Sequence, residues 1–74
     1  MVRLVLRVRM ISGDQIDVSY DDPDAGTDDE ALEHVVAILG QDSGVLRSRH
    51  GDRTVVLFGR GVASFEISPR GAVL

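Results

Sequence analysis

The chain has 74 residues, of which 43% are apolar and 27% charged, as expected for one small globular domain spanning residues 1–74. Twelve Asp and Glu residues against eight Arg residues give a net charge of -4, so bulk attraction of the whole chain to nucleic acid or anionic lipid is not expected. The absence of Cys excludes disulfides, thiolate metal sites and cysteine nucleophiles.

The N-terminal segment predicts a β-hairpin. Residues 2–11 alternate between an apolar face and a largely basic face, and residues 15–20 alternate again. Between them, residues 12–14 have the Ser-Gly-Asp composition of a turn. Matching the two apolar faces around a three-residue loop predicts a register in which Arg9 lies opposite Asp17.

A capped helix follows an acidic break that contains Pro23. Thr27 with Glu30 three residues later is a capping box, and Gly40 is a natural C-cap. The apolar residues between them have helical spacing and define the expected buried stripe, namely Leu32, Val35, Val36 and Leu39. The pattern predicts a helix over residues 27–39.

Three short strands are predicted after the helix, at residues 45–49, 53–58 and 62–68, separated by glycine-containing turns. The segment 55–58 is apolar on both faces, which is typical of a strand whose second face is also covered. The element order is therefore β-β-α-β-β-β, an α+β fold with one helix packed on a sheet, and we expect the last three strands to form a meander.

The residues that could support catalysis are few and isolated. His34 and His50 have no neighbouring base, nucleophile or metal ligand at a useful spacing, and no Lys is present. Asp22 and Asp24 have the spacing of a calcium loop, but Gly26 interrupts the series. We therefore expect no enzymatic activity, no catalytic residue, no bound metal and no cofactor.

Two charged clusters leave two alternative functions open. An acidic decoy that inhibits a nucleic-acid-acting host protein would gather its carboxylates on one face: Asp21, Asp22, Asp24, Asp28, Asp29 and Glu33. A nucleic-acid-binding protein would instead gather the arginines of its strands: Arg3, Arg7, Arg9 and Arg47. Aromatic residues make up only 4% of the chain, which argues against base stacking and therefore against nucleic acid as the partner.

Apolar residues in excess of one core predict an interface. Such residues lie on the outer face of the first strand, on the doubly apolar strand and at the C-terminus. On a small sheet without disulfides or metal, surplus apolar surface favours association, and a twofold dimer needs only one self-complementary patch. The expected interface residues are Val5, Ile11, Val55, Leu57, Val73 and Leu74.

Two resemblances accompany these patterns. The opening hairpin and the helix Thr27–Leu39 resemble the ubiquitin-like β-grasp in element order over the first half of the chain. The segments 51–58 (GDRTVVLF) and 62–67 (VASFEI) resemble the ending of short uncharacterised α+β proteins from actinobacteria and their phages. The second resemblance implies an origin and carries no catalytic residue.

These observations together predict a small non-enzymatic interaction or structural module that self-associates as a homodimer. The resemblance implies an accessory protein of an actinobacterium or its phage, and a host or cellular protein is the other expected partner class. No apolar run approaches the roughly 18 residues of a membrane span, and arginines interrupt the N-terminal apolar segment. We therefore expect no membrane association and a cytoplasmic location.

Overall fold

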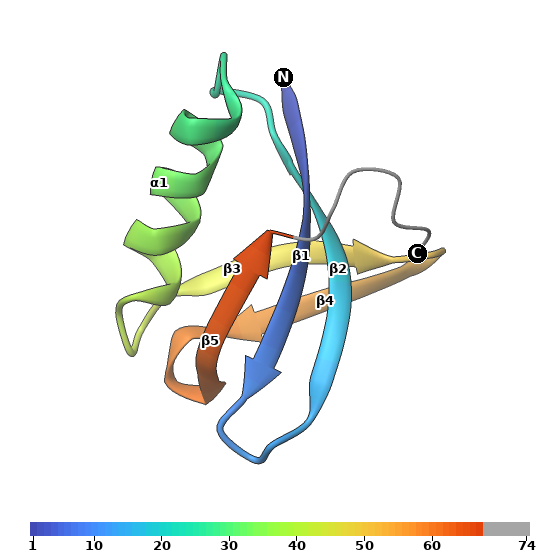
Figure 1. Cartoon of the computed structure of the whole chain (residues 1–74), viewed down its shortest axis with the longest axis vertical. Helices are drawn as coiled ribbons and strands as arrows, with labels where there is room; N and C mark the ends of the chain where they lie inside the picture. Colours follow the sequence, from blue (N-terminus) through green and yellow to red (C-terminus); the bar gives the residue numbers. More distant parts are fainter. Residues whose placement is uncertain (68–74) are drawn as a thin grey trace.

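A computed structural model describes residues 1–67 and confirms the α+β class and the order β-β-α-β-β-β. One helix, α1, packs on a five-stranded antiparallel sheet of order β4-β3-β2-β1-β5 (Figure 1). A short 3-10 turn, η1, precedes the last strand. The elements are β1 Val2–Met10, β2 Gln15–Asp22, α1 Asp28–Leu39, β3 Val45–His50, β4 Arg53–Phe58, η1 Gly59–Gly61 and β5 Val62–Ile67.

The helix begins and ends where the sequence predicts. The Thr27 hydroxyl accepts a hydrogen bond from the Glu30 N–H at 3.2 Å, and Gly40 is the C-cap. The Glu30 carboxylate accepts a bond from the Gly26 N–H at 3.3 Å, one residue before the N-cap. The first bond satisfies an N–H group that the first helical turn leaves without a partner, and the second fixes the residue that precedes the N-cap.

The predicted hairpin register is wrong by two residues. Arg7, not Arg9, lies opposite Asp17, and Arg9 lies opposite Gln15. A shift of two keeps every side chain on its own face, so alternation cannot distinguish the two registers. The observed register places two Arg–Asp pairs across the strands where the predicted register has one. Gly13 adopts a positive φ of 98° in the connecting turn, a conformation that glycine adopts without strain.

The expected meander after the helix is also wrong. β3 and β4 form a hairpin through a turn in which Gly51 has a φ of 62°, but β5 does not pair with β4. Instead, η1 redirects the chain across the molecule, and β5 pairs antiparallel with β1 at the other edge of the sheet (Figure 1). Thus β4 and β5 are the two edge strands.

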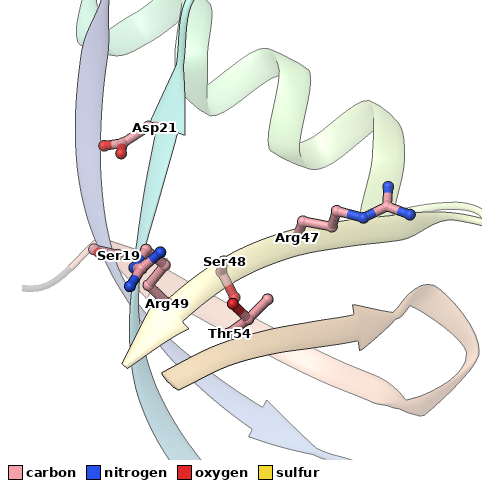
Figure 2. Close-up of a pocket in the computed structure, with 6 residues that line it drawn as sticks. All are labelled: Ser19, Asp21, Arg47, Ser48, Arg49 and Thr54. Carbon is pink, nitrogen blue, oxygen red and sulfur yellow. The ribbon is translucent and has the colours of Figure 1, made fainter. Parts of the chain in front are cut away.

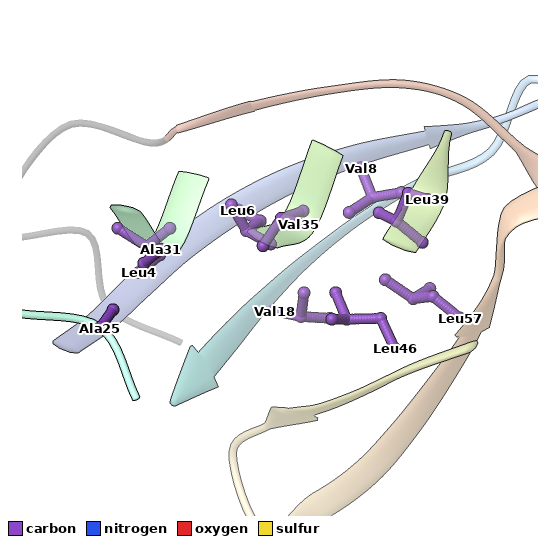
Figure 3. Packing of buried hydrophobic residues seen from close by; sticks show 10 residues of the cluster. All are labelled: Leu4, Leu6, Val8, Val18, Ala25, Ala31, Val35, Leu39, Leu46 and Leu57. Atoms are coloured by element: carbon purple, nitrogen blue, oxygen red, sulfur yellow. The ribbon is translucent and has the colours of Figure 1, made fainter. Parts of the chain in front are cut away.

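The core lies between the helix and one face of the sheet (Figure 3). Alternate residues of β1 and β2 belong to this core, and the β3–β4 hairpin contributes Leu46 and Leu57 to it. Its buried apolar members are Leu4, Leu6, Val8, Val18, Ala25, Ala31, Val35, Leu39, Leu46 and Leu57. The opposite face of the sheet has no helix over it in the described chain (Figure 1).

The two halves of the sheet meet at a narrow junction. Only one residue pair, Ser19 with Arg49, joins the ladders of β2 and β3. His50 strengthens this junction, because its Nδ1 lies 2.6 Å from the Asp17 carbonyl oxygen. A carbonyl oxygen only accepts, so Nδ1 carries the proton and donates. The β3–β4 hairpin consequently projects at an angle from the other three strands (Figure 1).

Candidate interaction surfaces

An apolar groove runs between the helix and the edge strand β5. It encloses about 470 Å³ and is lined by Leu32, Val36, Leu39, Gly40, Val62, Ala63, Ser64 and Phe65. Val36 on the helix is 47% exposed, and Ile67 at the end of β5 is 44% exposed. Exposed apolar side chains beside an unpaired strand edge form a surface that another chain can cover.

Within residues 1–67, the β5 edge lacks the usual protection against pairing with another strand. Natural edge strands are blocked by Pro, by Lys or by inward-pointing charges. β5 contains none of these, since Glu66 is its one charged residue and lies on the open face of the sheet opposite Arg7. A bulge between Arg9 and Met10 disturbs the pairing with β5 only at the start of that strand.

The open face of the sheet gathers the arginines. The register places Arg3, Arg7 and Arg9 on this face, and Arg49 opposite Ser19 places β3's arginines there too. Arg3 makes two hydrogen bonds to Asp21, at 2.6 and 3.2 Å, and Arg7 makes two to Asp17, at 3.0 and 3.4 Å. The four basic residues predicted from the sequence thus share one face, but two of them are paired with carboxylates.

These ion pairs affect the neighbouring carboxyl groups. The hydrogen bond from Arg3 holds the pKa of Asp21 below its ordinary value, and the positive charge of Arg49 acts in the same direction. Asp21 therefore stays ionised at neutral pH and neutralises Arg3. Because both partners are exposed, the pair contributes little to stability.

A shallow pocket of about 240 Å³ lies on the open face where β2 meets β3. It is lined by Ser19, Asp21, Arg47, Ser48, Arg49 and Thr54 (Figure 2). Arg49 lies beside Ser19, and Arg47 extends along β3 away from it. Ser48 is buried and its hydroxyl donates to the Val55 carbonyl at 2.8 Å, so the hydroxyl hydrogen is not available to a ligand.

On the helix side, a buried carboxylate holds a histidine. Asp22 is 2% exposed, accepts a bond from the Asp24 N–H at 3.0 Å, and lies 2.5 Å from His34 Nδ1. The bond to Asp22 raises the pKa of His34, and the same bond lowers the pKa of Asp22. The pair therefore ties the end of β2 to the middle of α1.

The structure separates the six predicted acidic residues. Asp21 and Asp22 are consecutive in a strand, so they point to opposite faces of the sheet, and Asp22 is buried. The remaining four are exposed in the loop and on the helix: Asp24, Asp28, Asp29 and Glu33. The six carboxylates do not form one continuous face.

The predicted interface residues also separate, and the choice of Leu57 needs correction. Leu57 is 3% exposed in the core, and Val55 packs against that core, so both lie on the covered face of β4. The exposed apolar residues of β4 are Val56 and Phe58. The physical reason is that α1 covers one face of the hairpin, and alternation alone does not say which.

The other predicted interface residues have three different positions. Val5 is half-buried on the open face. Ile11 is 70% exposed in the first turn, and its N–H donates to the Gly61 carbonyl at 3.0 Å, which places it at the start of β5. Val73 and Leu74 lie outside the described residues.

Val36 and Ile67 are interface candidates that the sequence reasoning missed. Val36 was assigned to the buried stripe of the helix, but Ala31, Val35 and Leu39 are the buried residues. A signal was present in the sequence, because seven apolar residues in a twelve-residue helix cover more than one core-facing stripe.

Within residues 1–67, no helix has the length and apolarity needed to cross a bilayer. No group of three or more His, Asp or Glu side chains in that range is arranged to hold a metal ion. No protein-family model, curated protein or solved structure matches the chain. The resemblances to the β-grasp and to the actinobacterial and phage proteins therefore stay predictions.

Proposed function

We propose that the protein is a small non-enzymatic interaction module that self-associates as a twofold dimer through its edge strand β5. The observation that carries the proposal is an unprotected strand edge bordered by an apolar groove. Antiparallel pairing of two β5 strands would continue the sheet across the dimer, a common mode of strand addition. It would act as an accessory protein, as the actinobacterial and phage resemblance implies. We place it in the cytoplasm because no apolar run of the sequence approaches the length of a membrane span.

The side chains at this edge support pairing with a second copy. A twofold axis beside Ser64 would place Glu66 opposite the partner's Val62, so no two like charges oppose each other across the new ladder. Val36 would face the second copy from the helix layer. A twofold interface is satisfied by one such patch, since each copy supplies both halves.

Burial of apolar side chains at this interface would contribute free energy to association. Full burial of a Val or Ile side chain contributes about 1.5–3 kcal/mol. Val36 and Ile67 are each about half exposed, so covering them contributes roughly 1 kcal/mol apiece in each copy. The apolar groove between α1 and β5 adds further apolar area. The hydrogen bonds of a new strand pair supply orientation in addition to energy.

The test is the mass of the protein in solution. Light scattering at micromolar concentration should give about twice the chain mass of 8.0 kDa. The double variant Val36→Glu with Ile67→Glu should give the monomer mass, because it places two charges in the interface. Val56→Glu is the matched control: Val56 is 40% exposed on β4, the other edge strand, so this variant should remain dimeric.

Two results would contradict the proposal. A wild-type mass of 8.0 kDa at these concentrations would exclude the dimer. A dimer that Val56→Glu disrupts and the double variant does not would place the interface on β4. Circular dichroism of each variant confirms that the fold is retained, since all three positions are exposed in the single chain.

A further inference from the structure

The β3–β4 hairpin has a charge opposite to that of the whole chain. Residues 45–60 contain four of the eight arginines and one of the twelve acidic residues, whereas the chain carries a net charge of -4. The hairpin projects from the sheet and is distant from the acidic start of α1 in the fold (Figure 1). Of these arginines, Arg47 and Arg49 share the open face of the sheet, which therefore presents a local positive surface on an acidic protein.

Two arginines of this surface are available to a ligand. Among residues 1–67, Arg47 and Arg49 form no ion pair, whereas Arg3 and Arg7 are each held by an aspartate. Arg47 and Arg49 are two positions apart on β3, about 7 Å along the strand, and they point in different directions (Figure 2). That arrangement suits successive phosphates of an extended chain better than one shared anion.

Hydroxyl groups and an aromatic ring complete the surface. Ser19 and Thr54 line the same pocket, and their hydroxyls have no hydrogen bond within the described chain. Phe58 is 45% exposed on the same face of β4, about 13 Å along the strand from Thr54. The Arg60 guanidinium lies over one face of the Phe58 ring, 5.3 Å from its centroid, so that face already contacts a cation.

We propose that this open face, formed by Arg47, Arg49 and Phe58, binds single-stranded nucleic acid. The guanidinium groups would contact phosphates, and one base would stack on the face of the Phe58 ring that Arg60 does not cover. A flat sheet with an exposed ring suits an unstacked base, which a duplex does not offer. An acidic protein segment would need the arginines but not the ring, so the exposed Phe58 favours nucleic acid. The inference is independent of the β5 dimer, because the hairpin lies at the other edge of the sheet.

The test is fluorescence anisotropy with a labelled oligothymidylate at low and moderate salt. Arg47→Ala should weaken binding and reduce the slope of log K against log salt by about 0.7, the value for one phosphate contact of a single strand. Phe58→Leu should weaken binding roughly tenfold, within the range for one stacked base, and leave the salt slope unchanged. Both positions are exposed, so the fold should be retained.

Arg53→Ala is the matched control, since it removes the same charge from the same hairpin. Arg53 precedes Thr54 in β4 and therefore lies on the opposite face, so its removal should leave affinity nearly unchanged. No binding by the wild type at micromolar concentration and low salt would overturn the proposal. Equal losses from Arg53→Ala and Arg47→Ala would overturn it too, because they would mean diffuse charge attraction. Equally tight binding of polyglutamate, unaffected by Phe58→Leu, would point to an acidic protein partner instead.

Discussion

The contact between Gly59 and Gln41 allows one stability prediction to be worked out in detail. Gly59 begins η1, and its N–H donates to the Gly44 carbonyl at 2.8 Å. A Cβ added at Gly59 would lie 2.0 Å from the Gln41 carbonyl oxygen, whereas Cβ contacts under 3.0 Å essentially never occur. Gly59→Ala must therefore separate two backbone segments by about 1 Å, because no side chain can rotate away.

The magnitude follows from two costs. Overpacking of this kind costs about 1–3 kcal/mol, and loss of the Gly59–Gly44 hydrogen bond costs about 1 kcal/mol more. The total of about 2–4 kcal/mol is a large part of the roughly 4–11 kcal/mol expected for a domain of 74 residues. For a domain of this size, that loss lowers Tm by about 10–30 °C.

Thermal and urea unfolding followed by circular dichroism measure this loss, with all proteins at one concentration because association shifts Tm. Gly26→Ala is the control: its Cβ would meet only the flexible Glu30 carboxylate, at 3.7 Å, so stability should change by less than about 0.5 kcal/mol. If Gly59→Ala is as stable as Gly26→Ala, the close packing of the two segments is wrong.

Three further predictions concern the helix and the core. Thr27→Ala should cost about 1 kcal/mol in urea unfolding, because the Glu30 N–H loses its cap; no change would refute the cap. Leu57→Glu should leave the chain unfolded by circular dichroism, since it buries an unpaired charge; a folded variant would show that Leu57 is not in the core. The raised pKa of His34 should make its contribution to stability complete below pH 6.5 and progressively lost as pH rises through the folded pKa. His34→Asn should remove this decline in urea titrations across neutral pH, and an unchanged profile would refute the role of the Asp22 bond.

The lowered pKa of Asp22 predicts that the stability contributed by the Asp22–His34 pair is also lost at acidic pH. Stability from the ionised carboxylate is complete above the ordinary value of 3.8 and is lost as pH falls through the lower folded pKa. The Asp22–His34 bond is therefore strongest at pH values between the two folded pKa values. The lowered pKa of Asp22 and the raised pKa of His34 both follow from one contact between β2 and α1.

Local patterns were enough to place the elements, and they failed where distant segments meet. The cap at Thr27 and the strand at residues 53–58 depend on neighbours in the sequence, so the predicted bounds agree with the structure. The pairing of β5 with β1 joins residues more than fifty positions apart, and no local signal specifies it. The hairpin register failed because period-two alternation is unchanged by a shift of two.

The sequence showed that surplus apolar residues exist, but it did not show where on the fold they are exposed. Residues 55–58 are apolar on both faces, which predicted a strand whose second face is also covered, but Val56 and Phe58 on that face are 40% and 45% exposed in the single chain. Which face is covered depends on where α1 lies, and the sequence reasoning chose Leu57 where the structure exposes Val56 and Phe58. The groove beside β5 needs the crossover of the last strand, so no reading of its residues alone could locate it.

The most direct test of the proposed dimer is amide hydrogen exchange, measured residue by residue at several protein concentrations. Alternate N–H groups of an edge strand face away from the sheet and exchange readily unless another strand pairs with them. The account predicts that protection in Val62–Ile67 rises with concentration, while that in Arg53–Phe58, the other edge, stays constant. Equal and concentration-independent exchange at the two edges would contradict it.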